Sequence, residues 1–359
     1  MEKEFDLLVF VGRFQPFHNE HKRIIDIALQ KSKNVLVLVG SAGKARTIRN
    51  PFTFQERKDM IEGAFQFLLE GDFETPTFIK DRLMVKPLYD KTYNDAAWIK
   101  QVQTIVLDTA LDVANNGNSF RASGYNDIKV GLIGACKDNT SYYLKMFPQY
   151  QSVNVEIQAD VHATAIRESF LEHGNLGGPV PRNVFTFLTD FAKTDAYYQL
   201  RSELEFVRDY KKQWEAAPYP VKHMTVDAVV EQSGHVLVVK RRAEPGKGLL
   251  AIPGGHLEVE ETLMNGVIRE LREETKIKVP DPVLRGSVVA TNMFDDPHRS
   301  NIGRVITYAA HIKLPDATSL PKVKGADDAE KAIWLPIGEV KEEMFFDDHF
   351  HIINHFLGL

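Results

Sequence analysis

Two histidines and an arginine follow the first apolar run of the chain. Arg13, His18 and His21 lie in "GRFQPFHNEH" (residues 12–21), between "LLVFV" and the helical pattern "KRIIDIALQ". The i, i+3 spacing of His18 and His21 places both side chains on one face of a helix. Helix amino ends attract anions, and imidazole and guanidinium groups stabilise phosphate oxygens that gain charge during in-line attack. Because Gly12 lets the backbone approach a ligand closely, the segment predicts a polyphosphate site.

A set of carboxylates forms a second candidate site. Glu270, Glu273 and Glu274 fall at i, i+3 and i+4 in "GGHLEVEETLMNGVIRELREET" (residues 254–275) and so project from one helix face. Oxygen donors without Cys or His select a hard ion such as Mg²⁺ or Mn²⁺, which can bind a diphosphate and activate water. Arg269 is placed to pair with a neighbouring carboxylate. A salt-bridged helix face in solvent would carry the same charges, so the charges alone leave both interpretations open.

The composition excludes several classes of protein. A length of 359 residues predicts about two domains, and a net charge of −5 gives no sign of a nucleic-acid or anionic-membrane partner. The amino terminus is acidic and no run of about eighteen apolar residues occurs, so we expect no signal peptide and no membrane span. Cys136 is the only cysteine, which rules out an internal disulfide and favours a reducing cytoplasm.

The order of apolar patterns predicts an α/β fold followed by an α+β fold. Over residues 1–180, the continuous runs "DLLVFVG", "NVLVLVG" and "IKVGLIG" alternate with helical patterns such as 19–31. They predict a Rossmann-like, doubly wound parallel sheet with helices on both faces, which binds ligands at the carboxyl ends of its strands. Residues 181–219 are predicted to form a helical extension and linker that ends at the prolines of "EAAPYP".

Residues 220–359 differ in pattern and are predicted to form a second domain. "HMTVDAVVEQSGHVLVVKRR" predicts a hairpin with a glycine turn. A helix over about 261–275, further strands near 284–313 and a final helix near 338–357 complete an α+β module. His351 and His355 share a face of that final helix, where we favour a solvated surface over a metal site because the zinc-protease pattern is missing.

The first segment resembles the signature of the nucleotidyltransferase superfamily, which is His-x-Gly-His after the first strand. The wording "GRFQPFH" is similar to that of the archaeal-type nicotinamide mononucleotide (NMN) adenylyltransferases. Three more segments follow in family order, "GSAGKARTIRNPFTFQER" (40–57), "DAAW" (95–98) and "HATAIRESF" (162–170). The resemblance implies a transfer of the adenylyl group from Mg-ATP to NMN that gives NAD and pyrophosphate. Glu20 departs from the family glycine, and its carboxylate could repel the triphosphate, coordinate Mg²⁺ or point into solvent.

The resemblance also implies a role for individual residues. His18 and His21 would stabilise the ATP phosphates, and Arg167 would hold their β/γ end. Arg49 would contact the NMN phosphate, and Trp98 would stack on the nicotinamide ring. The remaining implied members of this site are Gly12, Arg13 and Phe14 after the first strand, Asp95 beside the tryptophan, and Thr164, whose hydroxyl remains although Ala163 replaces a usual serine.

The second segment is identified as a Nudix box. Gly255, five residues, Glu261, seven residues and then "RELREET" match the box, and only Lys276 departs from it, where the box has glycine. Lys276 stands at the helix end, so we expect backbone strain there rather than loss of a ligand. The flanking segments "RRAEPGKGLLAIPGG" and "NMFDDPHRSNIGRVITYAAHI" resemble the Nudix ADP-ribose pyrophosphatases found fused to this type of adenylyltransferase.

This resemblance implies hydrolysis of ADP-ribose to AMP and ribose 5-phosphate with Mg²⁺, or with Mn²⁺ in its place. The implied metal ligands are Glu270, Glu273 and Glu274, with Glu258 as a further one; Gly254 and Gly255 would bring the backbone close, and Arg299 and Arg304 are candidates for the phosphate or the terminal ribose.

Taken together, the segments indicate a two-domain cytoplasmic enzyme of NAD metabolism, similar to the bacterial bifunctional NMN adenylyltransferase/Nudix hydrolases. Its substrates would be ATP, NMN and ADP-ribose, with no nucleic acid or membrane as partner, and a homo-oligomer remains open. In the alternative, the Nudix half is a non-hydrolytic sensor of ADP-ribose or another NAD metabolite, as in transcription regulators whose box is ruined. This box keeps all its glutamates and no basic recognition helix follows it, which disfavours the sensor.

Overall fold

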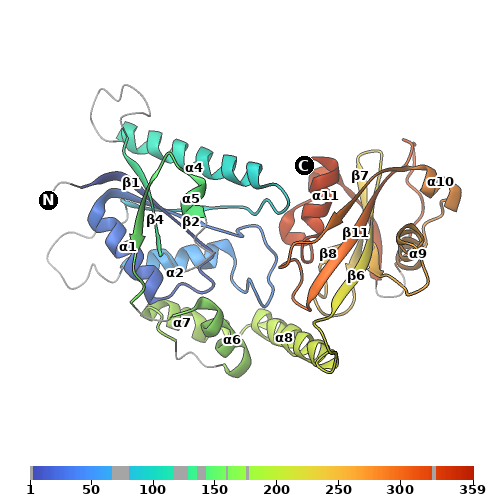
Figure 1. Ribbon diagram of the computed structural model, residues 1–359, viewed down its shortest axis with the longest axis horizontal. Coiled ribbons are helices and arrows are strands. Elements are labelled where there is room, and N and C mark those ends of the chain that lie inside the picture. The colour runs from blue at the N-terminus through green and yellow to red at the C-terminus, as the bar shows by residue number, and fades with distance from the viewer. Residues whose placement is uncertain are drawn as a thin grey trace. The chain divides into compact units, whose positions relative to one another are not determined.

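The chain forms two compact units, Met1–Gln199 and Leu200–Leu359, and each contains its own β-sheet (Figure 1). The computed structural model describes residues 3–66, 81–116, 128–135, 143–158, 161–174, 178–325 and 329–359. Cys136 lies outside the described residues.

The first unit is built on a parallel sheet with the strand order β3-β2-β1-β4-β5 among the described residues. This confirms the predicted Rossmann-like sheet, in which continuous apolar runs form strands that are buried on both faces. The strands are β1 (Phe5–Gly12), β2 (Ser32–Val39), β3 (Leu83–Pro87), β4 (Val130–Ala135) and β5 (Gln151–Val155).

Helices cover both faces of this sheet, as Figure 1 shows, with α1 (Asn19–Lys31) and α2 (Phe54–Gln66) on one face and α4 (Asp95–Asn116) and α5 (Tyr143–Met146) on the other. The helix predicted over 19–31 is confirmed. Three more helices follow along the chain, α6 (Ala163–His173), α7 (Arg182–Phe191) and α8 (Asp195–Gln213).

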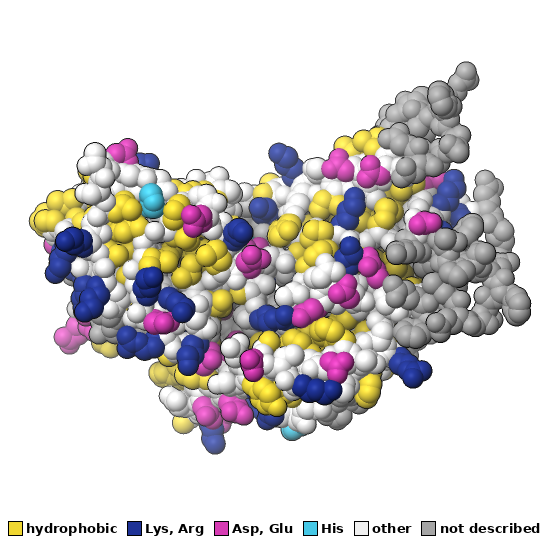
Figure 2. All heavy atoms as spheres, turned by 180° about the vertical axis from the view of Figure 1, so that it is seen from behind, with side chains coloured by type: hydrophobic (Ala, Val, Ile, Leu, Met, Phe, Trp, Pro, Cys, Tyr) yellow, Lys and Arg dark blue, Asp and Glu magenta, His cyan; other side chains and the backbone are white. Residues whose placement is uncertain are grey.

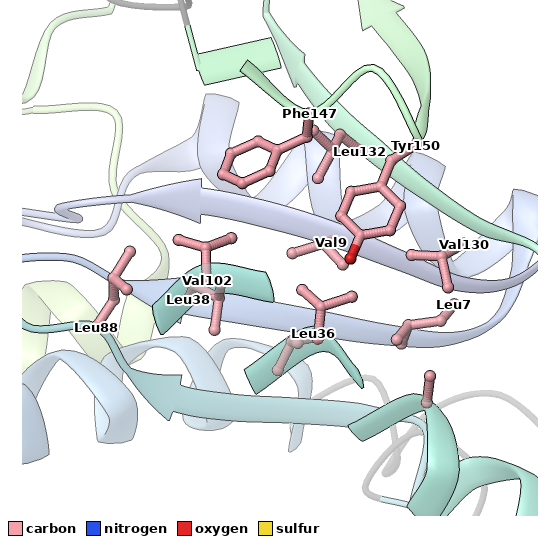
Figure 3. Close-up of a cluster of buried hydrophobic side chains, with 12 residues drawn as sticks. Leu7, Val9, Leu36, Leu38, Leu88, Val102, Val130, Leu132, Phe147 and Tyr150 are labelled. Atoms are coloured by element: carbon pink, nitrogen blue, oxygen red, sulfur yellow. The ribbon is translucent and has the colours of Figure 1, made fainter. Parts of the chain in front are cut away.

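The core between the sheet and α4 fixes the strand ends in place. Leu7 and Val9 of β1 and Leu36 and Leu38 of β2 point to the same side and pack with Val102 of α4, and all are fully buried (Figure 3). Burying one such side chain contributes about 1.5–3 kcal/mol. The carboxyl ends of β1, β2 and β4 are therefore held as a rigid edge.

The second unit contains a seven-stranded mixed sheet in the described residues, with the order β10-β11-β6-β7-β12, β8 on β7 and β9 on β6. The pair β6·β11 is parallel and the other pairs are antiparallel. The strands are β6 (Lys222–Gln232), β7 (His235–Arg241), β8 (Leu250–Ala251), β9 (Gly254–His256), β10 (Val288–Phe294), β11 (Arg304–Lys313) and β12 (Ala329–Pro336).

The predicted hairpin is confirmed by β6 and β7. Ser233 and Gly234, between the two strands, both have positive φ, of 46° and 74°, as a two-residue type I′ turn requires.

Two α-helices of the second unit lie on opposite sides of its sheet, α9 (Leu263–Thr275) and α11 (His349–Leu357) (Figure 1). Val267, Ile268 and Leu271 form the apolar stripe of α9 that packs on β6 and β11. This stripe positions α9, and with it the carboxylates beside the stripe. A short helix, α10 (Asp281–Gly286), precedes β10.

The final helix is shorter than predicted. Residues 337–344 form two 3₁₀ turns, η4 (Ile337–Glu339) and η5 (Glu342–Met344), and the α-helix begins only at His349. The reason is tertiary, because Phe345 bridges to Leu250 and the Phe346 backbone N–H donates to the Leu250 carbonyl over 2.9 Å.

The prediction of a solvated final helix is wrong for His351. Its residue surface is 2% exposed, and its Nε2 lies 3.2 Å from Oε1 of Glu342. His355 is exposed, and its Nε2 lies 3.2 Å from Nδ2 of Asn292. The two rings thus have different partners although they share a helix.

Charges of both signs are mixed on the face drawn in Figure 2, where Lys and Arg side chains are interspersed with Asp and Glu. This mixture agrees with the small net charge of −5. None of the helices described is both long enough and apolar enough to span a membrane.

Helix α9 ends in a left-handed residue that is not glycine. Lys276 has φ 48° and ψ 31°, and its backbone N–H donates to the Arg272 carbonyl over 2.9 Å. This is the strained helix end that the sequence predicts, since a side chain in this region costs about 1–2 kcal/mol.

We expect Lys276→Gly to raise the unfolding free energy of the second unit by about 0.5–1 kcal/mol, because glycine adopts this φ without strain but gains chain entropy on unfolding. Urea unfolding followed by circular dichroism checks it. The matched control is Lys278→Gly, an exposed lysine two positions on without a positive φ, which should not stabilise. Equal effects of both substitutions would contradict the assignment of strain.

Candidate functional sites

The first unit has a cavity of about 510 Å³ at the carboxyl ends of β1, β2 and β4. Residues of the α1 amino end, of α4 and of α6 complete its wall. The sequence-predicted residues that line it are Gly12, Arg13, Phe14, His18, His21, Trp98, Thr164 and Arg167. Arg49 and Asp95 are not among the lining residues, and Asp95 is exposed at the first position of α4.

The two histidines form a stacked pair. Their ring centroids are 3.5 Å apart with an interplanar angle of 20°. The His18 backbone N–H donates to Nδ1 of His21 over 3.3 Å, so the proton of a neutral His21 ring sits on Nε2. Burial, and then the neighbouring His18, hold the pKa of His21 well below its usual value. His21 is therefore suited to donate a hydrogen bond as a neutral imidazole rather than to act as a cation.

Arginines supply the positive charge of this cavity. Nη1 of Arg167 donates to the Gln15 carbonyl over 2.8 Å, and Nη2 lies 3.4 Å from Oγ1 of Thr164. Burial, and then the charge of Arg13, lower the pKa of Arg167 to about 10. Cations that destabilise one another beside a cavity favour the binding of an anion there.

Gly12 is needed for the shape of the loop after β1. A Cβ atom at this position would lie 2.8 Å from Cζ of Phe14, whose own φ is 53°. The Phe14 ring is buried and its centroid lies 4.9 Å from that of His21. The Phe14 ring thus packs against the His21 ring in an edge-type contact.

Arg57 is a buried organiser of the site that sequence reasoning missed. It is 1% exposed, and Nη1 donates to the carbonyls of Arg13 and Gly40 over 2.7 Å each, while Nη2 donates to that of Ser41 over 3.1 Å. Burial lowers its pKa to about 10. Arg57 thus joins the loop after β1 to the loop after β2. The only sequence signal was its place at the end of the quoted segment 40–57.

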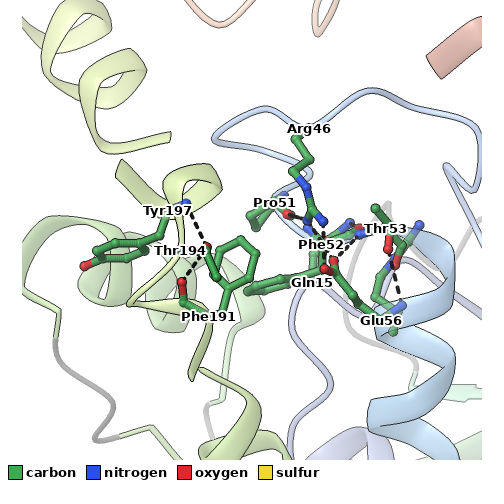
Figure 4. Close-up of polar contacts among 10 residues, drawn as sticks. Gln15, Arg46, Pro51, Phe52, Thr53, Glu56, Phe191, Thr194 and Tyr197 are labelled. Carbon is green, nitrogen blue, oxygen red and sulfur yellow. Dashed lines mark hydrogen bonds and ion pairs between the residues drawn. The ribbon is translucent and has the colours of Figure 1, made fainter. Parts of the chain in front are cut away.

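A second set of contacts holds the 46–57 segment against the first loop (Figure 4). Nε2 of Gln15 donates to the Phe52 carbonyl over 2.8 Å, and the Phe52 N–H donates back to Oε1 of Gln15 over 3.0 Å. Arg46 pairs with both carboxylate oxygens of Glu56 over 2.7 Å each. The Gln15–Phe52 bonds thus join the loop that lines the cavity to this segment, and the Arg46–Glu56 pair holds the segment itself together.

Two carboxylates also line the cavity. Glu20 forms an ion pair with Arg23 at 2.9 Å, and its side chain is 13% exposed. Of the three alternatives for this departure from the family glycine, a carboxylate in solvent is therefore wrong, and Arg23 compensates its charge. Asp90, which sequence reasoning did not single out, accepts a hydrogen bond from the Ser41 hydroxyl over 2.9 Å.

The second unit has a cavity of about 300 Å³ beside β9 and α9. Of the sequence-predicted residues, Gly254, Gly255, Glu274 and Arg299 line it. Asp227 and His349 line it too, and sequence reasoning gave neither a role: Asp227 lies in the segment quoted only for the hairpin, and His349 lies outside the box. Burial raises the pKa of Asp227 to about 6 and lowers that of His349 to about 3.

Arg269 gathers the carboxylates of the box. Nη1 donates to Oε1 of Glu270 and Oε2 of Glu273, over 2.9 Å each, and the other guanidinium nitrogens hold Glu261 at 2.6–3.0 Å. The pairing of Arg269 with neighbouring carboxylates is as predicted. Glu258 lies at the edge of this cluster, 3.9 Å from Nε of Arg269, with a side chain that is 67% exposed.

Gly254 and Gly255 allow the backbone of β9 to lie in direct contact with the carboxylates. The Gly254 N–H donates to Oε2 of Glu274 over 3.0 Å, and a Cβ at Gly255 would lie 2.4 Å from Oε1 of Glu270. Burial raises the pKa of Glu274 to about 8, and the charge of Glu270 adds to the shift.

The donor chemistry of the cluster fits a hard divalent cation. All its side-chain donors are oxygens. The raised pKa of Glu274 shows that its charged form is destabilised, and a bound cation would stabilise that form. In the arrangement described, Arg269 neutralises Glu270 and Glu273, and no three Asp, Glu, His or Cys side chains of the described ranges are grouped as a metal site.

The two predicted arginines differ in placement. Arg299 lines the cavity and forms a buried two-pronged pair with Asp348, with distances of 2.8 and 2.9 Å. Arg304, at the start of β11, is not a lining residue, and it contacts Asp295 through the backbone carbonyl and a 3.8 Å ion pair.

Comparison with known proteins gives the family of each unit. A cytidylyltransferase-like family model matches residues 9–168 and a NUDIX domain model matches residues 221–356. The crystal structure of a bifunctional NMN adenylyltransferase/ADP ribose pyrophosphatase from Francisella tularensis, complexed with AMP and a manganese ion, covers 99% of both chains with a TM-score of 0.86 and 33% identity. The chain belongs to this bifunctional family.

Single-domain relatives match each half of this family member. A nicotinamide/nicotinic acid mononucleotide adenylyltransferase from Acinetobacter baylyi is 35% identical over 201 residues, which are 56% of this chain and 94% of the relative. An ADP-ribose pyrophosphatase from Methanocaldococcus jannaschii is 29% identical over 134 residues, which are 37% of this chain and 72% of the relative. The chain is thus an enzyme with a nucleotidyltransferase domain and a Nudix hydrolase domain.

We expect Arg57→Met to destabilise the first unit by about 3 kcal/mol, because it leaves the carbonyls of Arg13, Gly40 and Ser41 buried without their donor. Thermal unfolding followed by calorimetry checks this. The matched control is Arg82→Met, which removes an arginine that also donates to backbone carbonyls, but to those of Leu29, Ser32 and Lys33, which do not line the cavity. A loss for Arg57→Met no larger than for Arg82→Met would contradict the organising role.

Proposed function

We propose that the first unit transfers the adenylyl group of Mg-ATP to NMN and so forms NAD and pyrophosphate. The observation that carries this is the stacked His18/His21 pair, with the pKa of His21 lowered by burial, at the wall of a cavity that Arg13 and Arg167 also line. We assign this activity to residues 1–180, the hydrolytic one below to residues 220–359, and the link between them to 181–219.

In this proposal the NMN phosphate attacks the α-phosphorus of ATP in line, and pyrophosphate leaves. Nε2 of His21 donates a hydrogen bond to an α-phosphate oxygen as charge gathers there, with His18 beside it. Arg167 and Arg13 bind the leaving pyrophosphate. No covalent intermediate with the protein is needed, because positioning and charge stabilisation lower the barrier.

We assign the NMN end of the cavity to the part that Trp98 lines, where its ring would stack on the nicotinamide. Thr164 lies beside Arg167 near the phosphates. Arg49 and Asp95 do not line the cavity in this structure. We propose that, once the substrate is bound, Arg49 contacts the NMN phosphate and Asp95 contacts the nicotinamide nucleotide.

We propose that the second unit hydrolyses ADP-ribose to AMP and ribose 5-phosphate with Mg²⁺ or Mn²⁺. Glu270, Glu273 and Glu274 would hold the ion, with Glu258 as an outer ligand; when bound, it binds the diphosphate and activates water. The chain's own groups orient this set: Arg269 holds the first two carboxylates, and the Gly254 N–H holds the third. Arg299 is proposed to face the phosphate and Arg304 the terminal ribose.

The alternative of a sensor without hydrolysis predicts a cavity in which the carboxylates are missing or dispersed. Here the Glu270 carboxylate lies next to Gly255, and the Glu274 carboxylate accepts a hydrogen bond from the Gly254 N–H, so the carboxylates of the box are held together. This observation favours hydrolysis, and AMP release from ADP-ribose separates the two functions because a sensor binds without turnover.

The two activities should be separable by single substitutions. We expect Glu273→Gln to reduce AMP release from ADP-ribose at least about 100-fold while NAD synthesis stays within a factor of two, and His18→Ala to do the reverse. Chromatography of both products from each variant measures this. Each variant serves as the folding control of the other, and loss of both activities in either would refute the division of labour.

A methyl group at Gly255 should block the hydrolytic site alone. We expect Gly255→Ala to lower AMP release at least about 10-fold, because its Cβ would overlap Oε1 of Glu270 and displace that carboxylate. Gly286→Ala is the matched control, since nothing lies within 4 Å of its Cβ position. Unchanged AMP release in Gly255→Ala would contradict a catalytic role for this carboxylate.

A further inference from the structure

The cavity of the second unit has an aromatic wall that comes from outside the Nudix domain. Phe206 and Tyr210 of α8 line it, together with Gly254, Gly255 and Glu274. The two rings are nearly parallel, with an interplanar angle of 25° and centroids 6.3 Å apart. The NUDIX model begins at residue 221, so the match to that domain does not include this wall.

Helix α8 is fixed to the second unit by residues other than Phe206. The buried Glu203 of α8 lies 3.5 Å from Nδ2 of Asn301. The Tyr210 ring packs beside His223 of β6, with centroids 5.6 Å apart. The wall therefore has a defined position relative to the carboxylates of the same unit.

Phe206 itself is exposed to the cavity and to solvent. It is 38% exposed, although its side chain is fully apolar. An aromatic surface left uncovered on a cavity wall is typical of a site that binds a flat ring, since covering it with a ring removes apolar area from water and adds stacking. The exposed ring is therefore available to a ligand with an aromatic face.

We propose that Phe206 and Tyr210 form the stacking subsite for the adenine of the ADP-ribose that the second unit hydrolyses. The inference rests on that proposed hydrolysis. The carboxylate end of the cavity, at Gly254, Gly255 and Glu274, takes the diphosphate, and adenine is the only aromatic ring attached to it. The terminal ribose offers no π-face and would extend away from the aromatic wall.

The subsite explains how a Nudix unit recognises the nucleotide end of its substrate through the linker helix. Stacking on an aromatic side chain changes binding of a base by about 5- to 150-fold. Because every base has a π-face, this contact selects for a base at that end of the diphosphate rather than for one hydrogen-bonding pattern.

The test uses the full chain and steady-state AMP release from ADP-ribose. We expect Phe206→Leu to raise KM and lower kcat/KM about 10-fold or more, with kcat within about threefold of the parent, because leucine keeps apolar bulk but not the ring. Tyr210→Leu removes the other ring of the wall and should raise KM in the same direction. Trp214→Leu is the matched control, because this aromatic residue packs on His223 but does not line the cavity.

A second arm compares ADP-ribose with the diphosphate of two ribose 5-phosphates, which has no base. The kcat/KM of the parent should be higher for ADP-ribose than for the base-free substrate by about the factor that Phe206→Leu loses on ADP-ribose. On the base-free substrate, Phe206→Leu and the parent should have the same kcat/KM. NAD synthesis by the same variants reports whether the first unit is intact, and an unchanged kcat for AMP release reports the same for the second. Equal losses on both substrates, or a loss confined to kcat, would overturn the subsite.

Failure of the proposed function gives a different result. If the parent releases no AMP from ADP-ribose, the hydrolysis is refuted, and binding of ADP-ribose to the parent, Phe206→Leu and Trp214→Leu is then measured by calorimetry. Weaker binding only in Phe206→Leu would still support the aromatic subsite. Equal affinity in all three, or no binding to the parent, would refute it.

Discussion

Each cavity of this protein is lined by a buried charged side chain that a neighbour of the same sign destabilises. In the first unit the pKa of Arg167 is lowered to about 10 by burial and by the neighbouring Arg13; in the second, the pKa of Glu274 is raised to about 8 by burial and by Glu270. Such groupings cost free energy unless a ligand of opposite charge is present. Both folds can be understood as ways to hold these groups in place until a phosphate or a cation relieves that cost.

The two units meet this requirement with different elements. In the first, parallel strands end together, so that loops after β1 and β2 and the amino end of α1 converge on one edge. Arg57 binds the two loops through their carbonyls without entering the cavity wall. In the second, one helix carries the carboxylates, and Arg269 binds two of them, Glu270 and Glu273. Strand β9 lies close to these side chains because two of its residues are glycines.

Departures from the two family motifs are absorbed locally. Glu20, in place of a glycine at the first site, is paired with Arg23, so its negative charge beside the proposed triphosphate is compensated. Lys276, in place of the glycine at the end of the box, adopts the left-handed conformation with φ 48°. Neither change removes a group that the proposed chemistry needs, and the second is a matter of stability rather than of catalysis.

The sequence alone was sufficient for features set by local geometry. The 3.6-residue period of a helix places Glu270, Glu273 and Glu274 on one face whatever surrounds them, and continuous apolar runs indicate buried parallel strands. The range of α1, the hairpin of β6 and β7, and the strain at Lys276 follow from such short-range rules.

Contacts between distant segments were decided only by the tertiary structure. Arg57 meets the carbonyl of Arg13 across 44 positions of the chain, and a single arginine in a helix carries no sign of that partner. The final helix starts late because Phe346 pairs with Leu250, and Phe206 becomes a cavity wall only because α8 packs on the second unit. Each of these depends on which surfaces folding brings together, and that is a property of the whole packed chain rather than of any local pattern.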